Sequence, residues 1–244
     1  MWKPPEALFT QCHIRRAIFN LGAGVDALMA MRTLPRDVPV IRLEDAGMAI
    51  QMAEYVALAV LRAYREQDAY ALAQREARWS PRRRLDKSTF CIGLLGVGVL
   101  GRGVLKALRA LEFPVAGWSR SSGMIDDVTV ASGENGLQEL LAKTRVLVVL
   151  LPDTSQTRGM LDRRLLSRLP AGAHVVNIAR GPLIVENDLL ALLDEGHLAS
   201  ATLDVFDEEP LPPGHRFWHH PRIVITPHVS AATLVDVSVG QVVE

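Results

Sequence analysis

The sequence predicts a doubly wound α/β fold, in which helices cover both faces of a mostly parallel sheet. Two observations predict it. From residue 90 onward, short apolar runs alternate with stretches of helical composition, and strands that alternate with helices form parallel sheets. In addition, the glycine-rich segment 96–101 joins the first apolar run to the first helical stretch, as a tight strand–turn–helix unit requires.

The expected elements follow one another along the chain. Residues 1–44 have weak periodicity and include a turn-like segment at 20–26. Residues 45–78 are rich in Ala, Leu, Met and Glu and lack proline, which predicts one long helix or a pair of helices. The basic segment 78–88 is broken by Pro81 and should be a connector.

Strands and helices should then alternate. Apolar runs predict strands at 90–95, 115–118, 146–150, 174–178, 199–203 and 223–225. Helical composition predicts helices at 99–110, 136–142, 162–168 and 186–194. Gly196 should end the last of these helices, because glycine readily adopts the left-handed conformation that follows many helix ends.

Composition excludes several classes of protein. The chain has 244 residues, 49% of them hydrophobic, and 27 basic residues balance 27 acidic ones. A folded protein without long-range attraction for nucleic acid or anionic membranes is expected, so we predict neither as a partner. Cys12 and Cys91 are too few for a disulfide framework. The chain starts without a signal-peptide pattern, and its apolar segment 46–61 is too short to span a membrane, which predicts a soluble cytoplasmic protein.

The glycine spacing is typical of a dinucleotide-binding loop. Gly96 would permit a tight turn, Gly98 would let the backbone approach a pyrophosphate, and Gly101 would let helix and strand pack closely. The pyrophosphate would lie at the helix N-terminus, whose free N–H groups bind anions. Alone the pattern could be a chance cluster of glycines, but the strand before it and the helix after it favour cofactor binding.

The end of the second predicted strand bears on which cofactor is used. NAD-binding proteins normally carry an acidic residue there, which accepts hydrogen bonds from the ribose hydroxyls. Here Ser119, Arg120 and Ser121 take that place. A guanidinium binds a 2′-phosphate that a carboxylate would repel, so NADPH is favoured over NADH, which remains possible. The alternative is that Arg120 is a solvated loop residue.

Polar side chains follow three successive predicted strands, at the sheet edge where α/β folds bind ligands. Arg180 could hold the carboxylate and the keto oxygen of a 2-keto acid, and Asp204 could accept from a nicotinamide carboxamide. Glu209 and His228 could pair, because a carboxylate raises the pKa of an imidazole and fixes its tautomer, giving a general acid near neutral pH. Each residue alone would more often be structural; their order makes coincidence improbable.

Other chemistries are less well supported. His215, His219 and His220 lie in a proline-bounded loop without supporting cysteine or carboxylate ligands, so we predict no metal site. The chain also lacks the Tyr-x-x-x-Lys, Gly-x-Ser-x-Gly and P-loop patterns, which argues against short-chain dehydrogenase, serine hydrolase and nucleotide triphosphatase mechanisms.

The motifs together resemble the D-isomer-specific 2-hydroxyacid dehydrogenases, over essentially the whole chain. They read LGAGVDAL, GLLGVGVLG, WSR, LLPDTSQTRGML, NIARGPLIVENDLL, LDVFDEEPLPP and ITPHVSAAT. The resemblance implies an NADPH-dependent Rossmann enzyme that reduces a small 2-keto acid such as glyoxylate or hydroxypyruvate. It implies a homodimer, in which the arm near 65–88, with Trp79, packs across the partner.

The resemblance also implies roles for individual residues. Arg180 would orient substrate, His228 would be the acid paired with Glu209, and the backbone amides of Ala23 and Gly24 would bind the substrate carboxylate. The implied cofactor contacts are Gly96, Gly98, Val99, Leu100, Gly101, Ser119, Arg120, Leu151, Pro152, Ile178, Ala179 and Asp204.

The resemblance divides the chain into parts. Residues 1–44 would be part of a flavodoxin-like substrate domain, 45–228 the cofactor domain, and 229–244 the start of the return to the substrate domain, so that the chain looks truncated at both ends. Alternatives therefore stay open. They are a nicotinamide-binding module without turnover, an inactive fragment, and a phosphoglycerate-type dehydrogenase.

Overall fold

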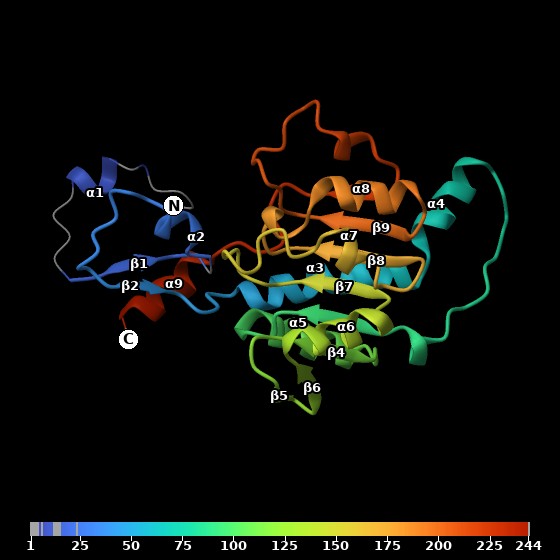
Figure 1. Ribbon diagram of the computed structural model, residues 1–244, viewed down its shortest axis with the longest axis horizontal. Coiled ribbons are helices and arrows are strands. Elements are labelled where there is room, and N and C mark those ends of the chain that lie inside the picture. Colours follow the sequence, from blue (N-terminus) through green and yellow to red (C-terminus); the bar gives the residue numbers. More distant parts are fainter. Residues whose placement is uncertain (1–4, 6, 12–15, 23, 244) are drawn as a thin grey trace.

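The structure is a computed structural model that describes residues 5, 7–11, 16–22 and 24–243. At its centre lies an eight-stranded sheet with the order β10-β9-β8-β7-β3-β4-β6-β5 (Figure 1). The strands are β3 (Ile92–Leu95), β4 (Val115–Trp118), β5 (Gly123–Ile125), β6 (Val128–Ala131), β7 (Val146–Val149), β8 (Ala173–Asn177), β9 (Leu198–Leu203) and β10 (Ile223–Ile225). Neighbours are parallel except for β5 and β6, which confirms the predicted α/β sheet.

Helices cover both faces of this sheet. They are α3 (Met48–Tyr64), α5 (Val99–Ala110), α6 (Gly133–Lys143), α7 (Arg163–Leu166) and α8 (Glu186–Asp194), whereas α4 (Gln67–Arg75) follows α3 and contributes to neither of the two clusters on the sheet. In β7, Val146 and Val148 pack into the cluster formed with α3 and α5, whereas Leu147 and Val149 pack into the cluster formed with α6, α7 and α8. Successive strand residues point to opposite faces, so a continuous apolar strand is what a sheet covered on both sides needs.

Most predicted elements are confirmed. Each predicted strand and each predicted helix from residue 90 onward coincides with an observed element to within three residues at either end. Gly196 follows α8 with a φ of +76°, as a helix-ending glycine should. The segment 45–78 forms a pair of helices, broken where Glu66 adopts a φ of +52°.

The β5–β6 hairpin is absent from the sequence-based expectations. Its strands have three and four residues, which is too short for alternation to stand out. The two residues of its turn, Asp126 and Asp127, both have positive φ, the geometry of a type I′ hairpin turn. Asn-Gly is the strong signal for that turn, and Asp-Asp is not.

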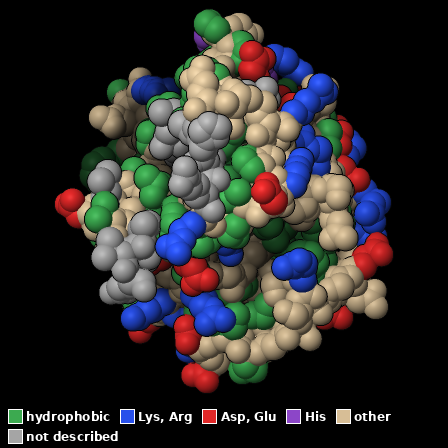
Figure 2. All heavy atoms as spheres, turned by 90° about the vertical axis from the view of Figure 1, so that its left-hand side faces the viewer, with side chains coloured by type: hydrophobic (Ala, Val, Ile, Leu, Met, Phe, Trp, Pro, Cys, Tyr) green, Lys and Arg blue, Asp and Glu red, His purple; other side chains and the backbone are tan. Residues whose placement is uncertain are grey.

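A smaller unit lies beside the carboxyl edge of the sheet. Its elements are α1 (Ala7–Gln11), β1 (Ile18–Asn20), α2 (Asp26–Met29) and β2 (Val40–Arg42), with β1 and β2 parallel. Helix α9 (Val235–Val243) lies against it in Figure 1, and the Thr233 hydroxyl donates to Leu21 O at 2.7 Å. Figure 2 views this end of the molecule, where basic and acidic side chains are interspersed with hydrophobic ones. The division at residues 44 and 228 stays a prediction.

His174, in β8, should make stability depend on pH. Its Nδ1 lies 2.8 Å from Ser200 Oγ, and burial, together with the charge of Arg145, lowers the pKa of His174 to about 4. An unfolded histidine has a pKa of about 6.5, so between pH about 4 and pH about 6.5 the unfolded chain binds more protons than the folded chain. The contribution of His174 to the free energy of unfolding is therefore fully present above pH about 6.5 and is lost as the pH falls toward 4.

We expect the free energy of unfolding, measured with urea, to fall by about 2 kcal/mol between pH 7.5 and pH 5 because of His174. Glutamine has no titratable group, so the free energy of unfolding of the His174→Gln variant should fall by about 2 kcal/mol less than that of the unaltered protein over the same pH range. Parallel stability profiles for the two proteins would contradict this assignment.

Candidate active site

The glycine turn joins β3 to α5, and its three glycines are needed for different reasons. Gly96 has a φ of +101°, and a Cβ on it would lie 2.9 Å from the Leu150 carbonyl carbon. A Cβ on Gly101 would lie 2.3 Å from Gly96 O. By contrast, Gly98 has an ordinary φ of −75°, and nothing lies within 4 Å of a Cβ built there. The protein's own packing therefore accounts for Gly96 and Gly101, whereas the space at Gly98 is open to a ligand.

This open space suits a dinucleotide phosphate. Gly98 is the residue before α5, and no side chain caps that helix. The first N–H groups of a helix lack partners within it and attract anions. Val99 in the first turn is 41% exposed, whereas Leu100 packs against the cluster of Leu43, Ala46 and Met48.

The segment after β4 leaves the sheet next to the glycine turn, because β4 pairs with β3. The Ser119 hydroxyl donates to Ser121 O at 2.6 Å, and Ser119 N donates to Ala131 O at 3.0 Å. These bonds hold the turn, and the Arg120 side chain is exposed beyond it. An exposed guanidinium at this edge is available to an anionic group of a bound ligand.

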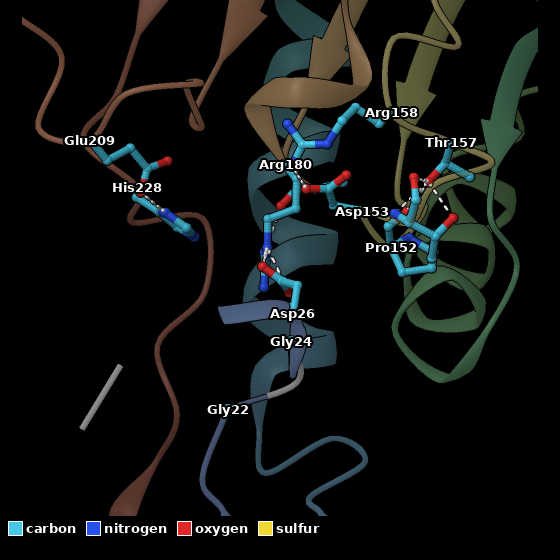
Figure 3. A network of polar contacts seen from close by, with 12 residues as sticks. Gly22, Gly24, Asp26, Pro152, Asp153, Thr157, Arg158, Arg180, Glu209 and His228 are labelled. Atoms are coloured by element: carbon cyan, nitrogen blue, oxygen red, sulfur yellow. Dashed lines mark hydrogen bonds and ion pairs between the residues drawn. The ribbon is translucent and has the colours of Figure 1, made fainter. Parts of the chain in front are cut away.

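The other predicted cofactor contacts lie at the ends of β7 and β8. Leu151, Ile178 and Ala179 are at most 8% exposed, so only their backbone or side-chain edges are open to a ligand. Pro152 is exposed, and its carbonyl accepts from the Thr157 hydroxyl at 2.6 Å. That bond holds the loop after β7 in the position seen in Figure 3.

His228 and Glu209 form a hydrogen-bonded pair. His228 Nδ1 lies 2.8 Å from Glu209 Oε2, and Glu209 Oε1 accepts from Phe206 N–H at 3.0 Å. The two side chains are 16% and 24% exposed. A carboxylate on Nδ1 keeps a proton there and leaves Nε2 to exchange a proton with a substrate.

Asp204 holds the loop that carries His228. It is completely buried, and it accepts from the Thr226 hydroxyl at 2.5 Å and from the N–H groups of Val229 and Ser230 at 2.9 and 2.8 Å. His228 has a φ of +55°, a conformation that persists only where the surroundings enforce it. These bonds flank His228 and supply that constraint. A nicotinamide contact for Asp204 stays a prediction.

Arg180 follows β8 and reaches the smaller unit. Its Nε donates to Asp26 Oδ1 at 3.2 Å and Oδ2 at 3.1 Å, and its Nη1 donates to Ala179 O at 2.6 Å. Burial raises the pKa of the Asp26 carboxyl, but the hydrogen bonds and charge of Arg180 outweigh burial and leave that pKa below its ordinary value. Gly24 lies against the guanidinium, since a Cβ there would come within 1.6 Å of Nη2. Ala23 lies outside the described residues.

The three chemical groups lie at one edge of the sheet. Arg180, Glu209 and His228 follow β8, β9 and β10, which are neighbouring parallel strands, so their carboxyl ends coincide. In Figure 3, Arg180 points toward Asp26 and Gly24, with the His228–Glu209 pair on one side and the loop after β7 on the other.

The contact between Asp26 and Arg180 is a feature that the sequence does not predict. Asp26 is the last residue of the turn-like segment at 20–26, and 154 positions separate it from Arg180. The local sequence around either residue does not predict such an ion pair.

The described part of the chain contains no group of three or more His, Cys, Asp or Glu residues that could hold a metal ion. In the proline-bounded loop, His215 Nε2 lies 3.1 Å from Glu186 and His220 Nε2 lies 3.2 Å from Asp194. Across the described residues, no helix is both long and apolar enough to cross a membrane.

The class of protein that this fold and site define is an NAD(P)-dependent dehydrogenase. Its parallel α/β sheet carries a glycine turn that is open to a dinucleotide phosphate, and a histidine–glutamate pair lies at the same sheet edge as an arginine. The model of the family "D-isomer specific 2-hydroxyacid dehydrogenase, NAD binding domain" matches residues 57–230. The chain belongs to the D-isomer-specific 2-hydroxyacid dehydrogenase family, and its type within that family is the glyoxylate/hydroxypyruvate reductase.

Individual relatives agree with this assignment. Glyoxylate/hydroxypyruvate reductase A of Yersinia enterocolitica is 46% identical over 100% of this chain and 79% of its own length. A D-isomer specific 2-hydroxyacid dehydrogenase from Xanthobacter autotrophicus, in complex with NADPH and MES, superposes with a TM-score of 0.94 at 40% identity, over 99% of this chain and 76% of that one. An NADPH-dependent glyoxylate/hydroxypyruvate reductase from Sinorhizobium meliloti, in complex with NADP and sulfate, gives 0.92 at 36% identity, over 99% and 77%.

Proposed function

We propose that this chain reduces a small 2-keto acid of the glyoxylate and hydroxypyruvate type to the 2-hydroxy acid, with NADPH as the preferred cofactor. The observation that carries the proposal is the hydrogen-bonded His228–Glu209 pair at the same sheet edge as Arg180 and the glycine turn. The relatives from Yersinia enterocolitica and Sinorhizobium meliloti are glyoxylate/hydroxypyruvate reductases, and two of the solved structures hold NADPH or NADP.

Each residue has a distinct task in this reaction. When bound, the reduced nicotinamide supplies the hydride that adds to the keto carbon. Protonated His228, held by Glu209, donates a proton from Nε2 to the keto oxygen, so that the carbonyl becomes a hydroxyl. Arg180 binds the substrate carboxylate and stabilises the negative charge that grows on the keto oxygen. The backbone N–H of Gly24, beside the guanidinium, supports the same carboxylate.

The cofactor would lie across the ends of the central strands. The glycine turn and the first turn of α5 would hold the pyrophosphate, and Arg120 would bind the 2′-phosphate. The fit rests on the open space at Gly98 and on the exposed guanidinium after β4.

A spectrophotometric assay tests the proposal directly. Purified protein with NADPH and glyoxylate, and separately with hydroxypyruvate, should consume NADPH and form the hydroxy acid. A protein that binds NADPH but reduces neither substrate would favour the non-catalytic module, and a preference for oxidising phosphoglycerate would favour the other dehydrogenase type.

Gly98→Ala should separate cofactor binding from folding. Because alanine suits the backbone conformation there and its methyl group meets nothing, the melting temperature should be unchanged. The methyl group would occupy the space that a pyrophosphate approaches, so we expect the Kd for NADPH, measured by fluorescence titration, to rise about tenfold or more, equivalent to about 1.4 kcal/mol.

Gly123→Ala is the matched control, because nothing lies within 4 Å of its Cβ position either and it lies on the edge strand β5. Its affinity for NADPH should equal that of the unaltered protein. An unchanged Kd in Gly98→Ala would rule out the pyrophosphate assignment.

Arg120→Asp should reverse the cofactor preference. The change replaces the cation that would bind the 2′-phosphate with an anion that repels it but can accept from ribose hydroxyls. We expect kcat/KM for NADPH to fall about a hundredfold, the loss of one or two charge-assisted hydrogen bonds, while kcat/KM for NADH is kept or improved. Arg168→Ser is the control, since Arg168 is exposed in the loop before β8, at the opposite edge. Equal losses with both cofactors would refute the role of Arg120.

We also propose a homodimer formed through the arm near 65–88. Large apolar side chains are exposed along α3, α4 and the segment after them: Ile50 62%, Leu58 68%, Leu72 51% and Trp79 98%. Such a surface is unusual on a monomer and typical of an interface. Sedimentation velocity should give twice the chain mass of 26.8 kDa; a species of that single mass would exclude the dimer.

A further inference from the structure

Asp26 places a carboxylate against the arginine that would bind substrate. The residue is the first of α2, in the smaller unit, whereas Arg180 follows β8 of the large sheet. Both carboxylate oxygens accept from the same Nε–H, at 3.2 and 3.1 Å. The side chains are only 32% and 27% exposed, so solvent screens this ion pair less than one on the open surface.

The contacts of Arg180 hold its guanidinium plane from several sides. Asp26 takes the Nε edge, and the carbonyl of Ala179 takes a hydrogen of Nη1 at 2.6 Å. The backbone of Gly24 lies against Nη2, so closely that a methyl group there would be only 1.6 Å from it. A planar guanidinium held at one edge presents its remaining N–H groups in a set direction, which a two-pronged contact with a carboxylate requires.

The negative charge of Asp26 and its hold on Arg180 should have opposite effects on the binding of a carboxylate substrate. Since the pKa of its carboxyl lies below the ordinary value, Asp26 is ionised at neutral pH. A negative charge beside a site for an anionic substrate weakens electrostatic attraction. By electrostatics alone, removing that charge should therefore tighten binding of a carboxylate, whereas loss of orientation should weaken it. The two effects have opposite signs and can be told apart.

We propose that Asp26 is a positioning residue, which holds the Nε edge of Arg180 so that the other guanidinium N–H groups meet the carboxylate of the 2-keto acid. The proposal rests on the function proposed above for Arg180. It also makes the smaller unit a participant in substrate binding through a side chain as well as through its loop backbone.

Oxamate, an unreactive mimic of a 2-keto acid, is the probe, and its Kd is measured by titration of the NADPH-bound protein. The variants are Asp26→Asn, which keeps the shape and removes the charge, and Asp26→Glu, which keeps the charge. Asp37→Asn is the matched control, because Asp37 is an exposed acid of the same unit. We expect Asp26→Asn to weaken oxamate binding about tenfold, because the neutral amide offers the Nε–H one acceptor oxygen in place of two charged ones, and to lower kcat for glyoxylate by at least as much. Asp26→Glu should be intermediate, and Asp37→Asn should match the unaltered protein.

A double-mutant cycle distinguishes positioning from a general structural role. Lysine lacks the Nε–H from which Asp26 accepts a hydrogen bond. In an Arg180→Lys background, Asp26→Asn should therefore change the affinity for oxamate by less than about twofold. An equal, tenfold effect in both backgrounds would overturn the proposal, because Asp26 would then act without Arg180. Oxamate binding to Asp26→Asn that is as tight as, or tighter than, in the unaltered protein would also overturn it.

The test of the role of Asp26 can fail independently of the test of keto-acid reduction. Protein that binds NADPH and oxamate but does not reduce keto acids would refute the proposed turnover, while the oxamate affinities would still decide the role of Asp26. Conversely, normal turnover with unchanged oxamate affinity in Asp26→Asn would refute only the positioning role. Protein that neither reduces keto acids nor binds oxamate would overturn both.

Discussion

Replacing His228 with alanine should lower kcat for glyoxylate reduction by about a hundredfold to ten-thousandfold, the usual contribution of a positioned general acid. Without the imidazole, the proton must come from water while negative charge grows on the keto oxygen. Because the imidazole is bound to Glu209 rather than to the glycine turn, the Kd for NADPH should change little. Steady-state rates with NADPH in excess, together with a fluorescence titration, measure both quantities.

His219→Ala serves as the control, since His219 is an exposed histidine of the neighbouring loop, and its kcat should be unaltered. Glu209→Gln should fall between the two, because glutamine still accepts from the imidazole but supplies no charge to stabilise its protonated form. If His228→Ala reduced glyoxylate at a rate comparable to that of the unaltered protein, His228 would not be the acid.

Replacing Gly181 with alanine should disrupt both stability and the site. A Cβ there would lie 1.9 Å from the Phe206 carbonyl carbon and 2.3 Å from Asp207 N, and backbone atoms cannot rotate away as a side chain can. Overpacking of this kind destabilises by about 1–3 kcal/mol, and more where the backbone itself must move. We expect the free energy of unfolding in urea to fall by at least about 2 kcal/mol.

The displaced segment would also affect catalysis. Phe206 N–H donates to Glu209, so a shift of this backbone moves the carboxylate that holds His228, and Arg180 is the residue next to Gly181. The kcat of Gly181→Ala should therefore fall at temperatures where the variant is still folded. Gly123→Ala, whose Cβ meets nothing, should keep both stability and activity. Unaltered stability in Gly181→Ala would show that the two loops do not approach each other this closely.

The large sheet could be predicted because its signal is local. In β3 and β7, runs such as Ile92–Leu95 and Val146–Val149 are apolar at every position, which only a sheet covered on both faces requires. Turns that carry a glycine with positive φ, such as the one at Gly96, mark where those strands end. The β5–β6 hairpin was missed because short edge strands carry neither signal.

The candidate site was predictable only in part. The residues at the strand ends could be listed because parallel strands bring their carboxyl ends together, and the pairing of His228 with Glu209 was correctly predicted and is observed at 2.8 Å. The three bonds that Asp204 accepts from the loop around His228 could not be anticipated, because hydrogen-bond partners depend on where two loops meet.

By itself, the sequence determined the α/β sheet, the position of the glycine turn and the family, because hydrophobic periodicity and short motifs are local properties of the chain. Only the tertiary structure decided that Asp26 meets Arg180 across 154 positions, that Gly98 borders open space, and that Gly181 touches the backbone after Phe206. Those are distances between segments remote in sequence, and they are set by how the sheet, its loops and the smaller unit pack together.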